Sequence, residues 1–155
     1  KFQISKITKN SRNREYVGVV EWLKNAGIVN ISYALNDLEL PLKGNCIYDN
    51  YRLYFGDTGL LIGSLDEECQ LYFYKDESKK LEMDFFLRDL DSLIPVEVKA
   101  SDGNTISLNK LINNNSYKNI KYGIKLCKKN IGFNGKFYTF PYFLTFLLKK
   151  YLKEK

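Results

Sequence analysis

The sequence predicts an α/β fold, and three observations carry that prediction. A helix-like stretch over residues 14–26 is followed directly by a strand-like stretch over residues 28–35. Three short apolar stretches, separated by polar turns, then follow in the middle of the chain. The last third of the chain again alternates helix-like and strand-like stretches. With 155 residues, of which 45% are hydrophobic and 15% aromatic, the chain has enough apolar material for a packed core.

The first predicted element is the helix over residues 14–26. Its apolar residues recur at the i, i+3, i+4, i+7 spacing of a single buried stripe. These residues are Tyr16, Val19, Val20 and Leu23. Ser11 or Asn13 can cap the start of the helix, and Gly27 stands at the position expected of a C′ residue.

A basic, capped helix followed at once by a strand has the order of a recognition helix and a wing, so residues 1–45 predict a small winged helix. Lys9, Arg12 and Arg14 would then lie where phosphate contacts are made. An amphipathic helix packed on a small sheet accounts for the same residues without any nucleic acid. The segment LPLKGN, residues 40–45, is the predicted boundary with a second domain over residues 46–155.

The second domain begins with a predicted strand over residues 50–55 and a short helix capped by Asp57. Three strands joined by tight turns should then form an antiparallel meander. They cover residues 70–74, 81–88 and 93–100. The remaining predicted elements are a helix over residues 107–113, a strand over 122–128 and a helix over 142–153. The last helix is apolar over a wide face, which predicts that another surface covers it.

The composition excludes several kinds of chemistry. The chain has no histidine, so Ser-His-Asp and Cys-His nucleophiles and histidine metal sites are excluded. The three cysteines show no CxxC spacing, which argues against a disulfide framework or a zinc site. No apolar run approaches the roughly 18 residues that span a bilayer, and there is no signal peptide, so we expect a soluble, cytoplasmic protein without a membrane partner. Because Met83 is the only methionine, we expect the chain to be a piece of a longer protein.

Charge is distributed unevenly along the chain. Residues 46–104 carry 6 Lys and Arg against 13 Asp and Glu, whereas residues 105–155 carry 11 against 1. A basic region beside an acidic one suits a polyanionic partner, and the acidic part could hold a cation. A lysine-rich surface is equally typical of ordinary solvation.

The stretch LEMDFFLRDLDSLIPVEVKAS, residues 81–101, contains the candidate site. If the hairpin turns between Leu90 and Asp91, the numbers of paired residues sum to 181, which sets Asp84 opposite Glu97 and Glu82 opposite Lys99. Since side chains alternate between the faces of a strand, Glu97 and Lys99 share a face.

Two like charges at paired positions are unfavourable unless something neutralises them. Asp84 and Glu97 with open positions around them suit Mg²⁺, which binds through one or two carboxylates and keeps several waters. Lys99 beside the ion could orient or help to deprotonate a water for attack on phosphorus. The competing interpretation is a solvated face with ordinary surface ion pairs.

The pattern of Asp84 followed by Glu97-Val98-Lys99 resembles the PD-(D/E)xK nuclease superfamily, which has the restriction-endonuclease-like fold. Longer segments are similar, in the same order, to the C-terminal region of uncharacterised prokaryotic AAA-type ATPases. These segments are YVGVVEWLKNAGIVNISYAL, LPLKGN, YRLYFGDTGLLIGSL, LYFYKDESKKLEMDFFL with LIPVEVKAS, and YGIKLCKKNIGFNGKFYTFPYFLTFLL. In that family an N-terminal P-loop ATPase precedes a winged helix and a nuclease-like core.

The resemblance implies a small winged helix followed by a restriction-endonuclease-like mixed sheet flanked by helices. It implies Asp84 and Glu97 as ligands of Mg²⁺ and Lys99 as the catalytic lysine of a nuclease. The implied partners are nucleic acid, with DNA expected, and the ATPase domain of the same full-length protein, which alone would bind ATP.

Two departures from the family pattern leave an alternative open. No G-x-x-x-x-G-K-[ST] motif occurs, so the ATPase lies outside this chain. The family also has a helix with a further acidic residue where this chain has only residues 65–69, and Glu67 or Glu68 would have to substitute for it. The alternative is therefore a catalytically inactive DNA-binding or protein-interaction domain that positions the ATPase.

Overall fold

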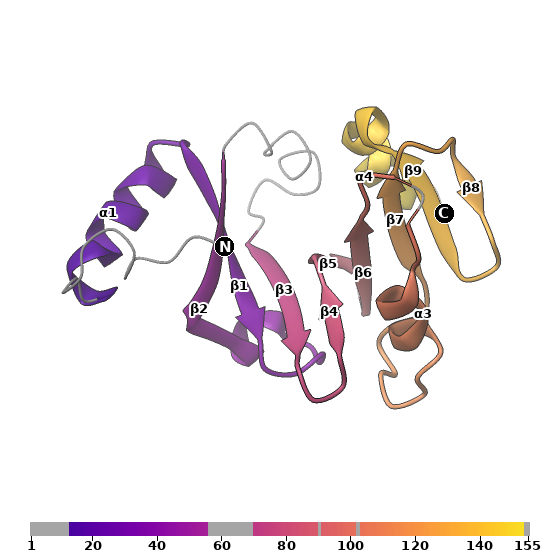
Figure 1. Cartoon of the computed structure of the whole chain (residues 1–155), viewed down its shortest axis with the longest axis horizontal. Coiled ribbons are helices and arrows are strands. Elements are labelled where there is room, and N and C mark those ends of the chain that lie inside the picture. The colour runs from indigo at the N-terminus through magenta and orange to yellow at the C-terminus, as the bar shows by residue number, and fades with distance from the viewer. Residues whose placement is uncertain (1–12, 56–69, 90, 102, 154–155) are drawn as a thin grey trace.

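The computed structural model of the chain describes residues 13–55, 70–89, 91–101 and 103–153, with the side chains of residues 13–17, 149, 152 and 153 left out of that description. The elements are, in order, α1 (Asn13–Asn25), β1 (Val29–Leu35), η2 (Leu42–Asn45), β2 (Cys46–Phe55), β3 (Leu71–Asp76), β4 (Leu81–Met83), β5 (Phe85–Asp89), β6 (Ser92–Val98), α3 (Ile106–Ile112), β7 (Gly123–Cys127), β8 (Gly132–Phe133), β9 (Phe137–Pro141), η4 (Tyr142–Leu147) and α4 (Leu148–Lys153). They form two mixed sheets with few helices, which confirms the α/β class (Figure 1).

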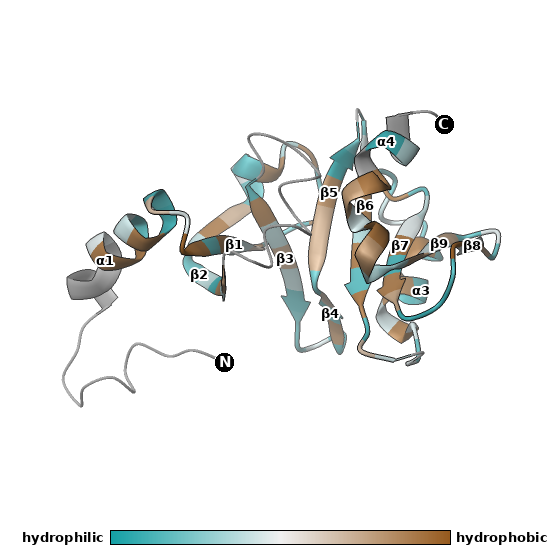
Figure 2. Ribbon diagram, turned by 90° about the horizontal axis from the view of Figure 1, so that it is seen from above, coloured by the Kyte–Doolittle hydropathy of each residue, from teal (hydrophilic) through white to brown (hydrophobic). Residues whose placement is uncertain are grey.

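Helix α1 ends as its sequence predicts. Gly27 has φ +71°, and the N–H groups of Gly27 and Ile28 donate to the carbonyl oxygens of Lys24 and Leu23. This pair of bonds is the Schellman arrangement, which glycine at C′ permits without steric cost. The helix lies at one end of the molecule, beyond β2 (Figures 1 and 2). Val20 of the predicted stripe is buried, but the prediction is wrong for Val19, which is exposed, as is Trp22.

The first sheet has the strand order β2-β1-β3-β4. Strand β1 pairs with β2 in the antiparallel and with β3 in the parallel direction. The sheet therefore joins residues from both sides of the predicted boundary at residue 45, and Leu42 of η2 is buried in its core. The winged helix, the nuclease-like fold and the division at residue 45 stay predictions.

The predicted strand over residues 81–88 is two strands. Strand β4 pairs with β3 in the first sheet, whereas β5 pairs with β6 in the second, and Asp84 lies between them. Both predicted antiparallel pairings are present. The ladder is broken because the Asp84 carboxylate, rather than a backbone carbonyl, accepts the hydrogen bond of the Val98 N–H at 2.9 Å.

The second sheet has the order β5-β6-β7-β9-β8, with β6, β7 and β9 parallel. One cluster of buried residues includes Met83, Phe86 and Leu108 of α3, and a second includes Phe85, Ile124 and Leu148. Figure 2 shows long apolar stretches in this part of the chain. Since each cluster takes residues from both sheets, the described strands share their packing.

Two features of the C-terminal part differ from the sequence-based expectation. Residues 142–153 form the 3₁₀ helix η4 and then α4 rather than one α-helix, and β8 and β9 were not predicted. Strand β9 is buried on both faces, so it lacks the alternation that marks a half-buried strand. The helix predicted after Asp57 lies outside the described residues. None of the described helices has the length and apolar character needed to cross a membrane.

Candidate functional site

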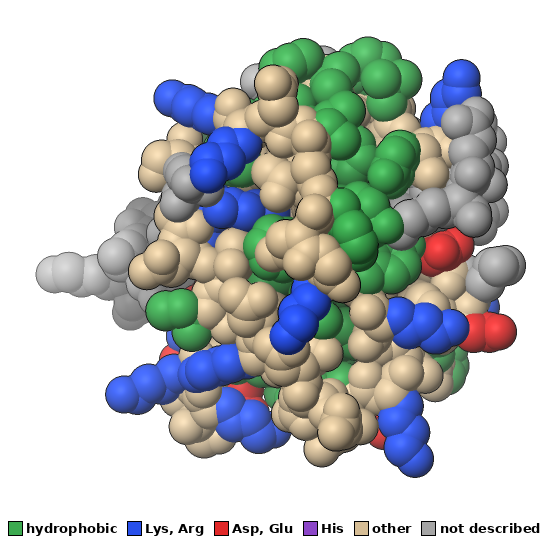
Figure 3. Space-filling model, turned by 90° about the vertical axis from the view of Figure 1, so that its right-hand side faces the viewer, with side chains coloured by type: hydrophobic (Ala, Val, Ile, Leu, Met, Phe, Trp, Pro, Cys, Tyr) green, Lys and Arg blue, Asp and Glu red, His purple; other side chains and the backbone are tan. Residues whose placement is uncertain are grey.

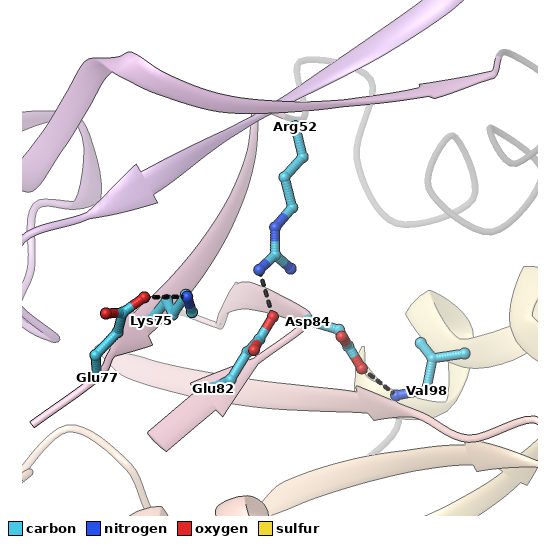
Figure 4. Close-up of polar contacts among 6 residues, drawn as sticks. All are labelled: Arg52, Lys75, Glu77, Glu82, Asp84 and Val98. Atoms are coloured by element: carbon cyan, nitrogen blue, oxygen red, sulfur yellow. Dashed lines mark hydrogen bonds and ion pairs between the residues drawn. The ribbon is translucent and has the colours of Figure 1, made fainter. Parts of the chain in front are cut away.

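The hairpin of β5 and β6 has the predicted register. Phe85 pairs with Val96 and Leu87 with Ile94, so paired numbers sum to 181. The ladder stops at the pair of Phe85 and Val96. The next residue along the β5 side is Asp84, and the next along β6 is Glu97. Figure 4 shows the Asp84 side chain directed at the backbone of Val98. The strand break thus fixes one carboxylate at the C-terminal end of β6.

Glu97 is the second carboxylate, and it is buried. Only 4% of the residue is exposed, so the solvated-face interpretation is wrong for this position. Its Oε1 lies 2.8 Å from Lys99 Nζ, while its Oε2 is buried without a hydrogen-bond partner. Among the described residues it is the only charged side chain with such an atom. A buried carboxylate oxygen without a donor is costly, which indicates that a further group completes this site.

Lys99 is held as a cation. The hydrogen bond that Lys99 donates to Glu97 raises the pKa of Lys99 most, burial lowers it, and the charges of Glu97, Asp84 and Glu82 raise it further. Lys99 is therefore protonated at neutral pH, which makes it a donor and a positive charge rather than a base. About a third of its side chain is exposed, so the ammonium group can reach a ligand from solvent.

The predicted pairing of Glu82 with Lys99 is wrong. Glu82 pairs with Lys75 in the ladder of β3 and β4, and its carboxylate forms an ion pair with Arg52 (Figure 4). The reason is the strand break at Asp84, which assigns Glu82 to the first sheet. The charge of Glu82 nevertheless contributes to the raised pKa of Lys99.

Arg52 and Tyr54 of β2 extend the site, although the sequence analysis did not single them out. The Arg52 guanidinium lies 3.9 Å from the centre of the Phe73 ring. Burial raises the pKa of Tyr54, the hydrogen bond and charge of Arg52 lower it, and Asp84 and Glu82 raise it. Tyr54 therefore lies among these charges. An arginine within the apolar stretch YRLYF was the available signal.

Lys125 of β7 is a second residue that sequence reasoning missed. It is buried, it is the register partner of Glu97, and its Nζ donates to the Gly103 carbonyl oxygen at 3.1 Å. A lysine inside the apolar strand GIKLC was the signal. Lys125 lies beside Glu97 because β6 and β7 pair in the parallel direction, and local sequence does not determine that pairing.

The structure does not test the predicted nucleic-acid contacts of Lys9, Arg12 and Arg14. Lys9 and Arg12 lie outside the described residues, and Arg14 lies in the first turn of α1, where side chains are not described. Helix α1 and strand β6 are well separated in Figures 1 and 2. The contacts of these three basic residues stay a prediction.

The residues present fit a small divalent cation. Glu97 offers its unpartnered Oε2, and Asp84 has one oxygen engaged by Val98. Both are hard oxygen ligands, and Mg²⁺ is commonly held by one or two carboxylates and waters. Across the described part of the chain, no group of three or more His, Cys, Asp or Glu residues gathers around one point. Glu67 and Glu68 lie outside that part.

One comparison with known proteins gives a match. A family model described as "domain of unknown function (DUF4143)" matches residues 60–143, which is more than half of the chain and includes Asp84, Glu97 and Lys99. No curated protein and no solved structure matches the chain.

Proposed function

The chain belongs to the DUF4143 family, and from that premise we propose that it is the C-terminal domain of a larger AAA-type ATPase and a metal-dependent, nuclease-like module acting on nucleic acid. One observation carries the proposal: Glu97 is buried, and its Oε2 has no partner. The carboxylate of Asp84, held by the Val98 N–H, adds a second oxygen ligand at the same strand end.

Each residue has a distinct role in this proposal. Mg²⁺, when bound, would supply Lewis-acid stabilisation of charge on the phosphate. Glu97 and Asp84 would hold it. Lys99, which is protonated, would contact an oxygen of the phosphodiester and stabilise negative charge there. In this role Lys99 acts as an electrostatic residue rather than as a base.

Calorimetric titration of Mn²⁺ and Mg²⁺ tests the ion site. We expect one site in the unaltered chain, loss of binding in Asp84→Asn and Glu97→Gln, and unchanged binding in Glu39→Gln. Glu39 is the matched control because its side chain is exposed and it lies before η2, outside the site. Absence of binding in the unaltered chain would contradict the proposal.

Cleavage of plasmid and linear DNA at low salt, with Mg²⁺ or Mn²⁺, tests the activity. Lys99→Met should lower the rate by about 100-fold or more, the usual effect of removing one preorganised donor to a developing charge. The same variant should still bind Mn²⁺, because removal of the Lys99 ammonium group frees Oε1 of Glu97. DNA left intact by the unaltered chain would remove the catalytic part of the proposal.

The second candidate is a catalytically inactive domain that binds DNA or a protein and positions the ATPase. The observation that favours it is the contact of Lys99 with Glu97, in which the ammonium group itself neutralises one carboxylate. Gel shifts should then show a steep salt dependence, insensitive to Lys99→Ala but weakened by charge reversal of Arg12 and Arg14.

A further inference from the structure

Three segments that are far apart in the sequence meet at one edge of the second sheet: the end of β6, the residues after β7, and η4. Strands β6, β7 and β9 are parallel, so their C-terminal ends lie along the same edge. Glu97 and Lys99 lie at the end of β6, Lys128 follows β7, and η4 begins directly after β9. The Lys99 N–H also donates to the Leu126 carbonyl oxygen at 2.9 Å, which ties the chain after β6 to β7.

Helix η4 presents two aromatic rings to solvent at this edge. Phe143 is 74% exposed and Phe146 is 56% exposed. Side chains three residues apart eclipse one another in a 3₁₀ helix, so both rings lie on the same side. The segment itself is anchored, because Tyr142 packs against the second buried cluster and Leu148 is fully buried. The rings are thus held in place.

Exposed lysines follow the elements at this edge. Lys128 and Lys129 come directly after β7, and Lys150 lies in α4, which continues from η4. Figure 3, which views the β8 and β9 end, shows apolar side chains gathered on one face with Lys and Arg side chains around them. Lysine is depleted at protein–protein interfaces, whereas a basic, aromatic surface complements a polyanion that has flat apolar faces.

We propose that this edge binds single-stranded nucleic acid, with bases stacked on Phe143 and Phe146 and the phosphate backbone beside Lys128. The inference names the form of substrate presented to Glu97 and Lys99, and in that respect it rests on the proposed function. A duplex keeps its bases stacked on each other and offers only phosphates to the edge. The surface therefore favours single strands over duplexes of the same length.

Fluorescence anisotropy with a labelled oligo(dT) of about 20 nucleotides tests the inference. The titration is done at low salt with EDTA, so that no metal contributes. Each of Phe143→Ala and Phe146→Ala should weaken binding by about fivefold or more, as expected for the loss of one base–aromatic stack. Lys128→Glu should weaken binding and reduce its salt dependence.

Two controls separate stacking from other effects. Tyr48→Ala removes an aromatic ring that is 62% exposed on β2 of the other sheet, and it should leave binding within about twofold. Phe146→Leu keeps an apolar side chain without a ring and should weaken binding nearly as much as the alanine variant. All variants change exposed side chains, so thermal melting should confirm that they remain folded.

The outcomes are decisive in both directions. Weaker binding by the phenylalanine variants, together with a preference for oligo(dT) over an abasic oligomer of equal length and over duplex, supports the inference. Equal affinity for oligo(dT) and the abasic oligomer, or unchanged binding by both variants, overturns it. Binding is measured in EDTA, and cleavage is measured separately with Mg²⁺. A strand that binds but is not cleaved would therefore contradict the proposed nuclease activity alone.

Discussion

Gly123 is a residue at which one added methyl group would collide with both a helix and a strand. A Cβ there would lie 2.6 Å from Leu108 Cδ1 and 3.2 Å from the Pro95 carbonyl oxygen. We expect Gly123→Ala to lower the free energy of unfolding by about 1–3 kcal/mol, the usual cost of overpacking. Denaturant titration measures this. Gly18→Ala is the matched control: a Cβ there meets nothing within 4 Å, so it should stabilise α1 by up to about 1 kcal/mol. Equal stability of the two variants would contradict the packing described for α3.

Buried phenols make stability fall at alkaline pH. Burial is the largest cause that raises the pKa of Tyr74 and of Tyr122 to about 12, from the ordinary value of 10.0. The unfolded chain loses these protons more readily, so their contribution is complete below pH 10.0 and is lost as the pH rises towards about 12. Denaturant titrations across this range should show a smaller loss of stability in Tyr122→Phe than in the unaltered chain. The same slope in both proteins would mean that Tyr122 is not protected from ionisation.

The register of the hairpin that ends at Asp84 and Glu97 could be predicted from the sequence because a tight hairpin fixes its own register. The alternation of side chains along two short strands was sufficient, and the structure has that register. The burial of Glu97 and the neighbourhood of Lys125 could not be predicted. Both depend on the parallel pairing of β6 with β7, whose partner residues are separated by α3 and its loops.

At the scale of an element, the break between β4 and β5 depends on one side chain. Asp84→Ala would leave the Val98 N–H without its acceptor, which should cost about 1–3 kcal/mol. Asp84→Asn keeps a side-chain oxygen that can accept this bond and should cost less. Hydrogen exchange at the Val98 amide distinguishes the two, since protection should fall only in the alanine variant. Equal protection in both would mean that the carboxylate does not hold this strand end.

Elements with a clear period or cap were predicted well, and those defined by distant partners were not. Helix α1 has an apolar stripe and a glycine at C′, and β1 follows it as expected. Strand β9 was missed because both of its faces are buried. Residues 142–147 form a 3₁₀ helix although their apolar spacing suits an α-helix, because the chain leaves the sheet at Pro141 and packs Tyr142 and Thr145 inward.

At the scale of the whole molecule, the two sheets share their buried clusters and α1 stands apart from them. Within the described residues, α1 leaves Val19 and Trp22 exposed, whereas the described residues of β6 and β7 are nearly all buried. We expect amide exchange in α1 to occur through local opening, with protection well below that of β6 and β7. Native-state hydrogen exchange under mild denaturant measures both. Equal opening free energies for α1 and β7 would show that the helix unfolds only with the rest of the chain.

The parallel pairing of β1 with β3 has a consequence for the order of folding. Ser32 pairs with Leu71, so the chain must close a loop of 38 residues before that contact forms, whereas β5 and β6 meet across a turn of two residues. The entropic cost of closing a loop grows with its length, and non-local pairings form slowly. The hairpin that brings Asp84 towards Glu97 is therefore expected to form before β1 docks.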